Sequence, residues 1–137
     1  MNNELVQYLL NYAYDHGIGY KIEAVDPDWI PVYIPWKNLI IINSNWRDPK
    51  QIALQVAHEI GHALNDDSEF EYQACFSATS KVERAATRRG LEIIIKHVYD
   101  DSELYDVNYR QFMDVLSVPG HYEGDVKSLI TDYFKNR

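Results

Sequence analysis

The sequence predicts an α+β domain, in which a small, mostly antiparallel sheet of about three strands packs with helices. Two observations support this fold class. Short runs of β-branched and aromatic residues within residues 20–42 alternate with turn sequences, whereas apolar residues recur at helical spacing before and after this region. A group of strands followed by helices is typical of α+β domains. The length of 137 residues corresponds to about one domain, so we expect residues 1–137 to form a single domain.

The first helix and the strands are expected in the N-terminal third of the chain. Residues 4–15 carry Leu5 and Leu9 at helical spacing, and a glycine follows at a position where a helix commonly ends. The strands are expected over residues 20–25, 32–34 and 39–42. Pro31 and Pro35 bracket the second strand, and proline cannot donate a hydrogen bond to a neighbouring strand. We therefore expect the second strand at an edge of the sheet.

The rest of the chain is expected to be mainly helical. The predicted helices cover residues 48–64, 80–99, 109–116 and 123–134. The first of them has the clearest start, because Asp48 can cap it and Pro49 suits its first position. Gln51, three residues after Asp48, completes a capping-box pattern.

Composition excludes several classes of protein. The chain has 21 acidic and 13 basic residues and a net charge of −8, so we expect no direct binding of nucleic acid. Its single cysteine, Cys75, allows neither an internal disulfide nor a multi-cysteine zinc site, which fits the reducing cytoplasm. No signal peptide is evident at the N-terminus, and no apolar stretch approaches the ~18 residues of a membrane span. We therefore expect a cytoplasmic protein that does not associate with membranes.

One short motif on the helix predicted at residues 48–64 points to metal chemistry. His58 and His62, with Glu59 beside the first, form an H-E-x-x-H pattern. Histidines four positions apart lie one turn apart on one helical face, so both imidazoles can reach one metal ion. The glutamate then lies near a water molecule on that metal. A chain of this composition contains such a pattern by chance with a probability of roughly 1%, so chance is a weak explanation.

The direction of the histidines argues against a role in core packing. At ~100° per residue, the apolar residues of this helix span about 0° to 140° from Ile52, whereas His58 and His62 fall at about 240° and 280°. The two histidines therefore point away from the apolar stripe. The alternative to metal binding is that both are ordinary surface histidines.

A catalytic zinc site needs a third protein ligand. A metzincin-type extension is excluded, because Asn65 and Ser68 occupy the positions where that class has glycine and a further ligand. Glu69 and Glu71 follow the motif so soon that the chain has little room to turn back. Glu83 begins a new predicted helix further along the chain, which leaves room for a reversal. We therefore expect Glu83 to be the third ligand.

The helix that carries Glu83 has features suited to this role. Ala86, Thr87 and Gly90 share its face at helical spacing, and small side chains let two helices approach closely. Thr87 can also hydrogen-bond a metal-binding imidazole and fix its tautomer. The alternative is that Glu83 is an exposed residue paired with a neighbouring basic side chain.

The stretch over residues 55–64, followed by Glu83-Arg84-Ala85-Ala86-Thr87, resembles the ImmA/IrrE family of small metallopeptidases. Members show an HE(L/I)GH helix and then an E-x-x-A-(N/D) helix whose glutamate completes the zinc site. The resemblance covers roughly residues 20–95 and implies a minimal, thermolysin-like zincin core. It also implies one Zn²⁺ per chain, bound by His58, His62 and Glu83, with Glu59 as the catalytic residue.

The resemblance further implies a cytoplasmic zinc endopeptidase of narrow specificity, of a kind carried by phages and mobile elements. Its expected substrate is a helix-turn-helix repressor or a similar regulator. This chain shows no helix-turn-helix of its own, so any effect on DNA would run through that partner. The alternative is an anti-repressor binding module that keeps the zincin core and acts by protein–protein binding without cleavage.

The hydrolytic mechanism also calls for a donor to the developing oxyanion, and the sequence does not choose one. The candidates are His97, His121, Tyr72, Tyr99, Tyr105 and Tyr122. His97 lies about 21 Å along a straight helix from Glu83 and cannot be a further ligand. The His121-Tyr122 pair, in a predicted loop, is the preferred candidate.

Overall fold

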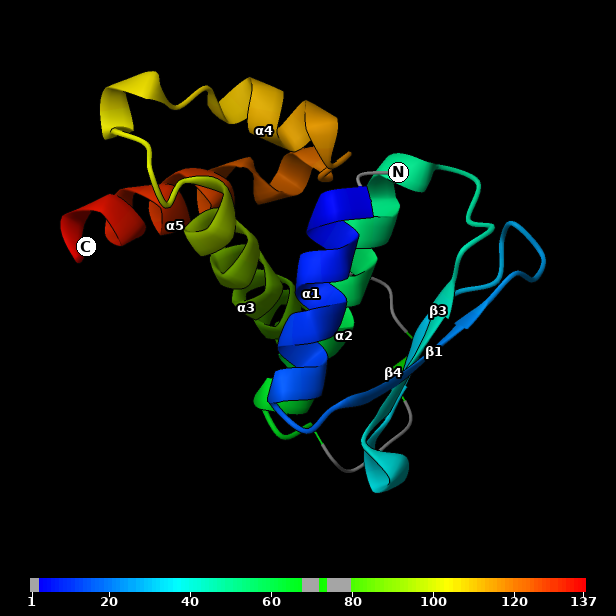
Figure 1. Cartoon of the computed structure of the whole chain (residues 1–137). Coiled ribbons are helices and arrows are strands. Elements are labelled where there is room, and N and C mark those ends of the chain that lie inside the picture. The colour runs from blue at the N-terminus through cyan, green and yellow to red at the C-terminus, as the bar shows by residue number, and fades with distance from the viewer. Residues whose placement is uncertain (1–2, 68–71, 74–79) are drawn as a thin grey trace.

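A mixed sheet and a group of helices lie side by side in the computed structural model (Figure 1). The structure describes residues 3–67, 72–73 and 80–137. Glu69, Glu71 and Cys75 lie outside the described residues. Strands followed by helices confirm the predicted α+β class.

The sheet contains the three expected strands and one more. Its strands are β1 (Gly19–Glu23), β2 (Val32–Ile34), β3 (Leu39–Asn43) and β4 (Tyr72–Gln73). They lie in the order β1-β3-β2-β4. The β1–β3 pair is parallel, whereas β2 runs antiparallel to both of its neighbours. The sheet is thus mixed rather than mostly antiparallel: two of its three strand pairs are antiparallel, but the parallel β1–β3 pair is the longest.

The prediction that the second strand lies at an edge is wrong. β2 pairs with β3 on one side and, through Val32 and Tyr33, with β4 on the other. Pro31 precedes the strand, and Pro35 begins the 3-10 turn that follows it. Because both prolines lie outside the paired residues, neither has to donate a hydrogen bond to the sheet.

All five predicted helices are present, with ends within a few residues of those expected. They are α1 (Asn3–Asp15), α2 (Ile52–Leu64), α3 (Lys81–Val98), α4 (Tyr109–Val115) and α5 (Glu123–Lys135). A 3-10 turn, Pro49–Gln51, leads into α2, and the Asp48 side chain accepts a hydrogen bond from the Lys50 backbone. The Gln51 side chain does not form the expected capping box. It accepts a hydrogen bond from the Trp46 indole N–H and donates one to the Ser117 carbonyl instead.

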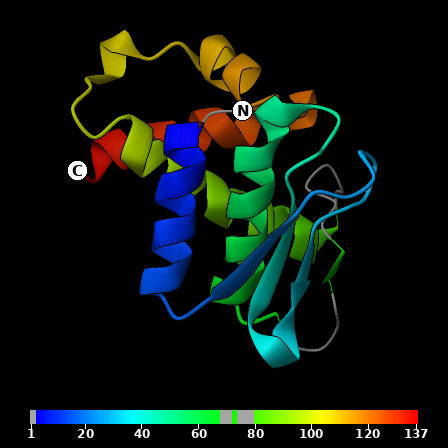
Figure 2. The same cartoon turned by 45° about the vertical axis from the view of Figure 1, so that its right-hand side comes forward.

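The helix α2 occupies the centre of the molecule. Figures 1 and 2 show α1 and α2 against one face of the sheet, α3 beyond α2, and α4 and α5 across one end of the helices. Every residue of α2 from Ile52 to His62 is buried. The main hydrophobic core forms around it, with Leu9, Ile40, Ile60, Leu91 and Ile94 all at 0% exposure.

The helices α2 and α3 pack backbone against backbone at two places. A β-carbon on Gly61 would lie 2.2 Å from the Ala86 carbonyl oxygen, and one on Gly90 would lie 2.6 Å from the Ala57 carbonyl oxygen. Only glycine fits at such distances. The small residues predicted on the Glu83 face therefore do bring α3 against α2.

The described helices include none that combines the length and the apolar character needed to cross a membrane.

Candidate metal centre

Three side chains that the sequence singles out meet between α2 and α3. His58 and His62 project from α2 and Glu83 from the first turn of α3, and a ligand atom from each lies within 4.8 Å of the others. Nε2 of His58 lies 3.0 Å from Oε2 of Glu83. Nε2 of His62 lies 3.1 Å from Oε1 and 3.2 Å from Oε2 of the same carboxylate. Both imidazoles therefore turn the same ring nitrogen toward one carboxylate.

The start of α3 places Glu83 at this point. Ser80 caps the helix, since its hydroxyl accepts a hydrogen bond of 3.3 Å from the Glu83 backbone N–H. The cap begins the helix nearly two turns before the tight contact between Ala86 and Gly61, and Glu83 lies one turn before that contact. Glu83 is consequently held beside the histidine face of α2.

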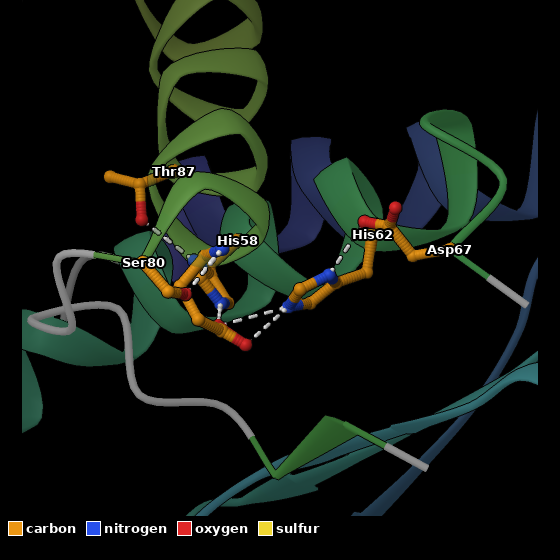
Figure 3. Close-up of polar contacts among 6 residues, drawn as sticks. His58, His62, Asp67, Ser80 and Thr87 are labelled. Atoms are coloured by element: carbon orange, nitrogen blue, oxygen red, sulfur yellow. Dashed lines mark hydrogen bonds and ion pairs between the residues drawn. The ribbon is translucent and has the colours of Figure 1, made fainter. Parts of the chain in front are cut away.

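A hydroxyl group orients the first imidazole. Nδ1 of His58 lies 2.7 Å from Oγ1 of Thr87, and both side chains are at 0% exposure (Figure 3). This contact is the one expected from the sequence. It engages Nδ1 and directs Nε2 toward Glu83, an arrangement usual for metal-binding histidines.

A carboxylate orients the second imidazole. Nδ1 of His62 donates to Oδ2 of Asp67 over 2.9 Å (Figure 3). Asp67 reaches the ring because α2 ends in a Schellman turn, in which Asp66 adopts a left-handed φ of 57°. In this turn the Asp67 N–H bonds to the His62 carbonyl and the Asp66 N–H to the Ala63 carbonyl. The backbone thus folds back and places the carboxylate against the histidine.

The histidines are buried rather than exposed to solvent. Both have 0% exposure, although they lie off the apolar stripe of α2, because α3 covers this side of the helix. Their ring centroids are 4.6 Å apart and their planes are nearly perpendicular, at 89°. The alternative of two ordinary surface histidines does not fit this geometry.

Burial and hydrogen bonding act in opposite directions on the ionisation of these groups. Burial lowers the pKa of His58 and outweighs its bond to Glu83. Burial also acts to lower the pKa of His62, but its bonds to Glu83 and Asp67 prevail and raise it. Burial would raise the pKa of Glu83, yet the two imidazoles hold it at about 2. Glu83 is therefore an ionised carboxylate, as a metal ligand must be.

Glu59 is a buried carboxyl group beside this cluster. It is at 0% exposure, and burial raises its pKa well above the usual range, with a further contribution from the charge of Glu83. Neither of its carboxylate oxygens has a hydrogen-bond partner within the described part of the chain. The same holds for both amide atoms of Gln55, one turn earlier on α2. Buried polar groups without partners are costly, so this pair indicates a place for polar ligands.

The donor set fits a catalytic zinc ion. Two imidazole nitrogens and one carboxylate oxygen are a common set of three protein ligands at such a site. Thr87 and Asp67 leave Nε2 of each histidine available for a metal ion. The partnerless carboxyl group of Glu59, near enough to Glu83 to feel its charge, would be available to a water molecule on such an ion.

Three of the expected oxyanion donors lie apart from the cluster. The His97 ring stacks on Tyr8 at 3.7 Å, near the C-terminal end of α3. Tyr99 caps that end and packs on Phe112. Tyr105 is 85% exposed. None of these side chains enters the contacts described for His58, His62 and Glu83.

The remaining candidates differ in position. Tyr72 lies in β4, and its side chain is outside the described structure. His121 is exposed and lies against the Tyr122 ring, with the centroids 4.4 Å apart. Tyr122 is only 1% exposed; burial raises its pKa, and Thr87 and Glu83 are near enough to contribute to the shift. Of the six candidates, Tyr122 is the one whose described surroundings include a residue of the cluster.

Asp67 is the residue of the cluster that the sequence reasoning missed. Positions 65 and 68 bear on the metzincin pattern, and Glu69 and Glu71 on the third ligand, so none of these positions predicts a partner for His62. The signal was an acidic residue just after the predicted helix end, where a Schellman turn would bring it back to the last turn.

Comparison with known protein families agrees with this geometry. The family model described as IrrE N-terminal-like domain (Peptidase_M78) matches residues 15–113, which is more than half of the chain. The matched segment contains all four residues predicted to form the site. No match was found among curated proteins or among solved structures.

Proposed function

The chain belongs to the IrrE N-terminal-like family of metallopeptidase-type domains, and on this premise we propose that it is a zinc-dependent endopeptidase of narrow specificity. The observation that carries the proposal is the meeting of His58, His62 and Glu83 beside a buried carboxyl group that lacks a partner, Glu59. A structural zinc site would have a closed set of four ligands and would need no such carboxyl group.

In this proposal His58, His62 and Glu83 hold one Zn²⁺ per chain. A zinc ion bound there would lower the pKa of a water molecule and polarise the carbonyl group of the scissile peptide bond. Thr87 and Asp67 keep the two imidazoles in the required tautomer and orientation.

Glu59 is the proposed general base and acid. The positive charge of a bound zinc ion would favour the ionised form of this buried group, and its carboxylate would take a proton from the attacking water as the water oxygen bonds to the carbonyl carbon. When the carbon–nitrogen bond breaks, Glu59 delivers that proton to the leaving amine. The absence of any described hydrogen-bond partner leaves both of its oxygens free for this transfer.

The sheet offers an edge at which an extended substrate can bind near the cluster. β4 is an edge strand, and its partner residue Tyr33 lies close enough to Asp66 and Asp67 for their charges, in addition to burial, to raise its pKa. Asp67 bonds directly to His62. In the proposal, substrate main-chain groups bond to this edge and place the scissile bond beside Glu59.

The proposed substrate is a helix-turn-helix repressor or a similar regulator in the cytoplasm. The net charge of −8 suits a basic, DNA-binding partner and argues against direct binding of nucleic acid by this chain. Any effect on transcription would then follow from loss of the partner.

The test is co-expression with a repressor-like protein encoded beside this chain. Wild type should cleave the repressor, and Glu59→Gln should retain zinc but lose at least about a hundredfold in cleavage rate. Glu92→Gln is the matched control, because Glu92 is an exposed residue on α3. If Glu59→Gln relieved repression as well as wild type with the repressor intact, the chain would act as an anti-repressor by binding alone.

A further inference from the structure

Two buried polar side chains on α2 lack hydrogen-bond partners within the described part of the chain. All but two of the seven buried polar or charged side chains described, Asn43 and Asp125 among them, form hydrogen bonds or ion pairs with other residues. The exceptions are Gln55, at 1% exposure, and Glu59, at 0%. The proposed reaction uses Glu59 for proton transfer but leaves Gln55 without a role.

Gln55 lies on the side of α2 that carries the histidines. At ~100° per residue, it falls about 20° from His62 and about 60° from His58 around the helix axis. Ala57 and Gly61, which lie against α3, are about 160° and 120° away from it on the same scale. The amide of Gln55 is therefore turned toward the proposed zinc site and away from the contacts between the two helices.

The chemistry of this amide indicates which partner it could take. A buried amide without hydrogen bonds is costly, and an apolar side chain of similar volume would occupy the position without that cost. In Gln55 both Nε2, a donor, and Oε1, an acceptor, lack partners among the described residues. A second carboxamide group satisfies both at once, because two such groups can form two parallel N–H···O bonds.

The arrangement of the sheet brings a substrate side chain to this position. α2 packs on one face of the sheet (Figures 1 and 2), and in the proposed function the substrate adds a strand at the β4 edge. Side chains of an added strand point alternately to the two faces of the sheet, so every second one points toward the face that α2 covers. Gln55 precedes Glu59 by one helical turn, which places their β-carbons ~5–6 Å apart. A side chain beside the scissile bond is therefore within reach of both.

We propose that Gln55 is a specificity-determining residue, whose side-chain amide binds an asparagine or glutamine side chain of the substrate next to the scissile bond. This inference rests on the proposed function and narrows its substrate class to chains with a carboxamide at that position. It does not depend on which regulator is cleaved.

A stability measurement tests whether the amide serves a ligand or the fold. Gln55→Met replaces the amide with an apolar side chain of similar volume. The metal-free variant should unfold at the same urea concentration as wild type or at a higher one, because it buries no unpaired amide. Gln111→Met is the matched control, since Gln111 is exposed on α4, and its midpoint should be that of wild type. A clearly lower midpoint for Gln55→Met would show that the amide supports the fold, and would overturn the inference.

A binding measurement tests the ligand without any need for cleavage. Three small peptide analogues carry a hydroxamate, a group that binds zinc ions, and differ only in the adjacent residue, which is glutamine, asparagine or methionine. Zinc-loaded wild type should bind one of the carboxamide compounds at least about tenfold more tightly than the methionine compound, which leaves Gln55 unpaired. Gln55→Met should lose this preference, whereas Gln111→Met should keep it. Isothermal titration calorimetry measures the affinities.

The outcomes separate this inference from the proposed function. If zinc-loaded wild type binds the three compounds equally, or binds none of them, the specificity role of Gln55 is wrong while the proposed zinc site stands. The same holds if Gln55→Met keeps the preference of wild type. If wild type takes up no zinc, the proposed function fails, and this inference fails with it.

Discussion

Gly61 on α2 faces the backbone of Ala86 on α3 so closely that a β-carbon at residue 61 would lie 2.2 Å from the Ala86 carbonyl oxygen and 2.9 Å from its carbonyl carbon. Gly61 separates Ile60 from His62 in the metal motif, and Ala86 lies one turn after Glu83. The contact therefore sets the distance between the helix that carries the histidines and the helix that carries the third proposed ligand.

Gly61→Ala should force the two helices apart. The contact is with backbone, which cannot rotate away as a side chain can, so we expect the free energy of unfolding to fall by about 3 kcal/mol, near the upper end of typical overpacking costs. Zinc affinity should fall too, because Glu83 would move away from the histidines. Urea unfolding and zinc titration of the same protein measure the two effects.

Gly124→Ala is the control for Gly61→Ala. A β-carbon there meets nothing within 4 Å, and Gly124 lies in the first turn of α5. Alanine is the better helix former, so this variant should be as stable as wild type or more stable by up to about 1 kcal/mol. Equal unfolding free energies for the two variants would show that the Gly61 contact is not tight.

The sequence predicted those features that depend on residues close together in the chain. The start of the 3-10 turn that leads into α2 follows from Asp48 and Pro49, and the shared face of His58 and His62 follows from helical spacing alone. The contact between Thr87 and His58 was also predicted, because it needs only two helices in contact through small residues.

Local sequence patterns did not predict the features that depend on tertiary contacts. Strand β4 has only two residues and is defined by its pairing with β2, so no run of β-branched residues predicts it. Because β4 was not predicted, β2 was wrongly expected at the edge of the sheet. Likewise, Asp125 pairs with Arg84 and Arg88 only because α5 folds back on α3, a long-range packing that no local pattern encodes.

Purified protein should contain about one zinc ion per chain, as expected for a single catalytic site. Alanine at His58, His62 or Glu83 should abolish stoichiometric zinc, because each change removes one of the ligand atoms now within 4.8 Å of one another. Elemental analysis after dialysis measures the content. Stoichiometric zinc in Glu83→Ala would mean that another residue is the third ligand.

Asp67→Asn should weaken zinc binding about tenfold. The carboxylate accepts a 2.9 Å hydrogen bond from His62 Nδ1, and loss of its charge makes the imidazole a poorer metal ligand. Asp66→Asn provides the matched control, since Asp66 is exposed and its φ of 57° suits asparagine. Equal zinc affinities for the two variants would show that the bond from His62 to Asp67 does not contribute.

Asp125→Asn should destabilise the protein at neutral pH by about 2 kcal/mol, a typical value for hydrogen bonds to a charged group. Burial acts to raise the pKa of Asp125, but its bonds to Arg84 and Arg88 prevail and lower it. A carboxyl group with a lowered pKa contributes its full stability above the pKa of the unfolded chain, about 3.9, and loses it as the pH falls through the folded value. The stability difference between wild type and Asp125→Asn, measured by urea unfolding, should therefore be constant from pH 7 to about pH 5 and shrink below about pH 4. A difference that stayed constant down to pH 2, or grew, would show that the ionised carboxylate is not what ties α5 to α3.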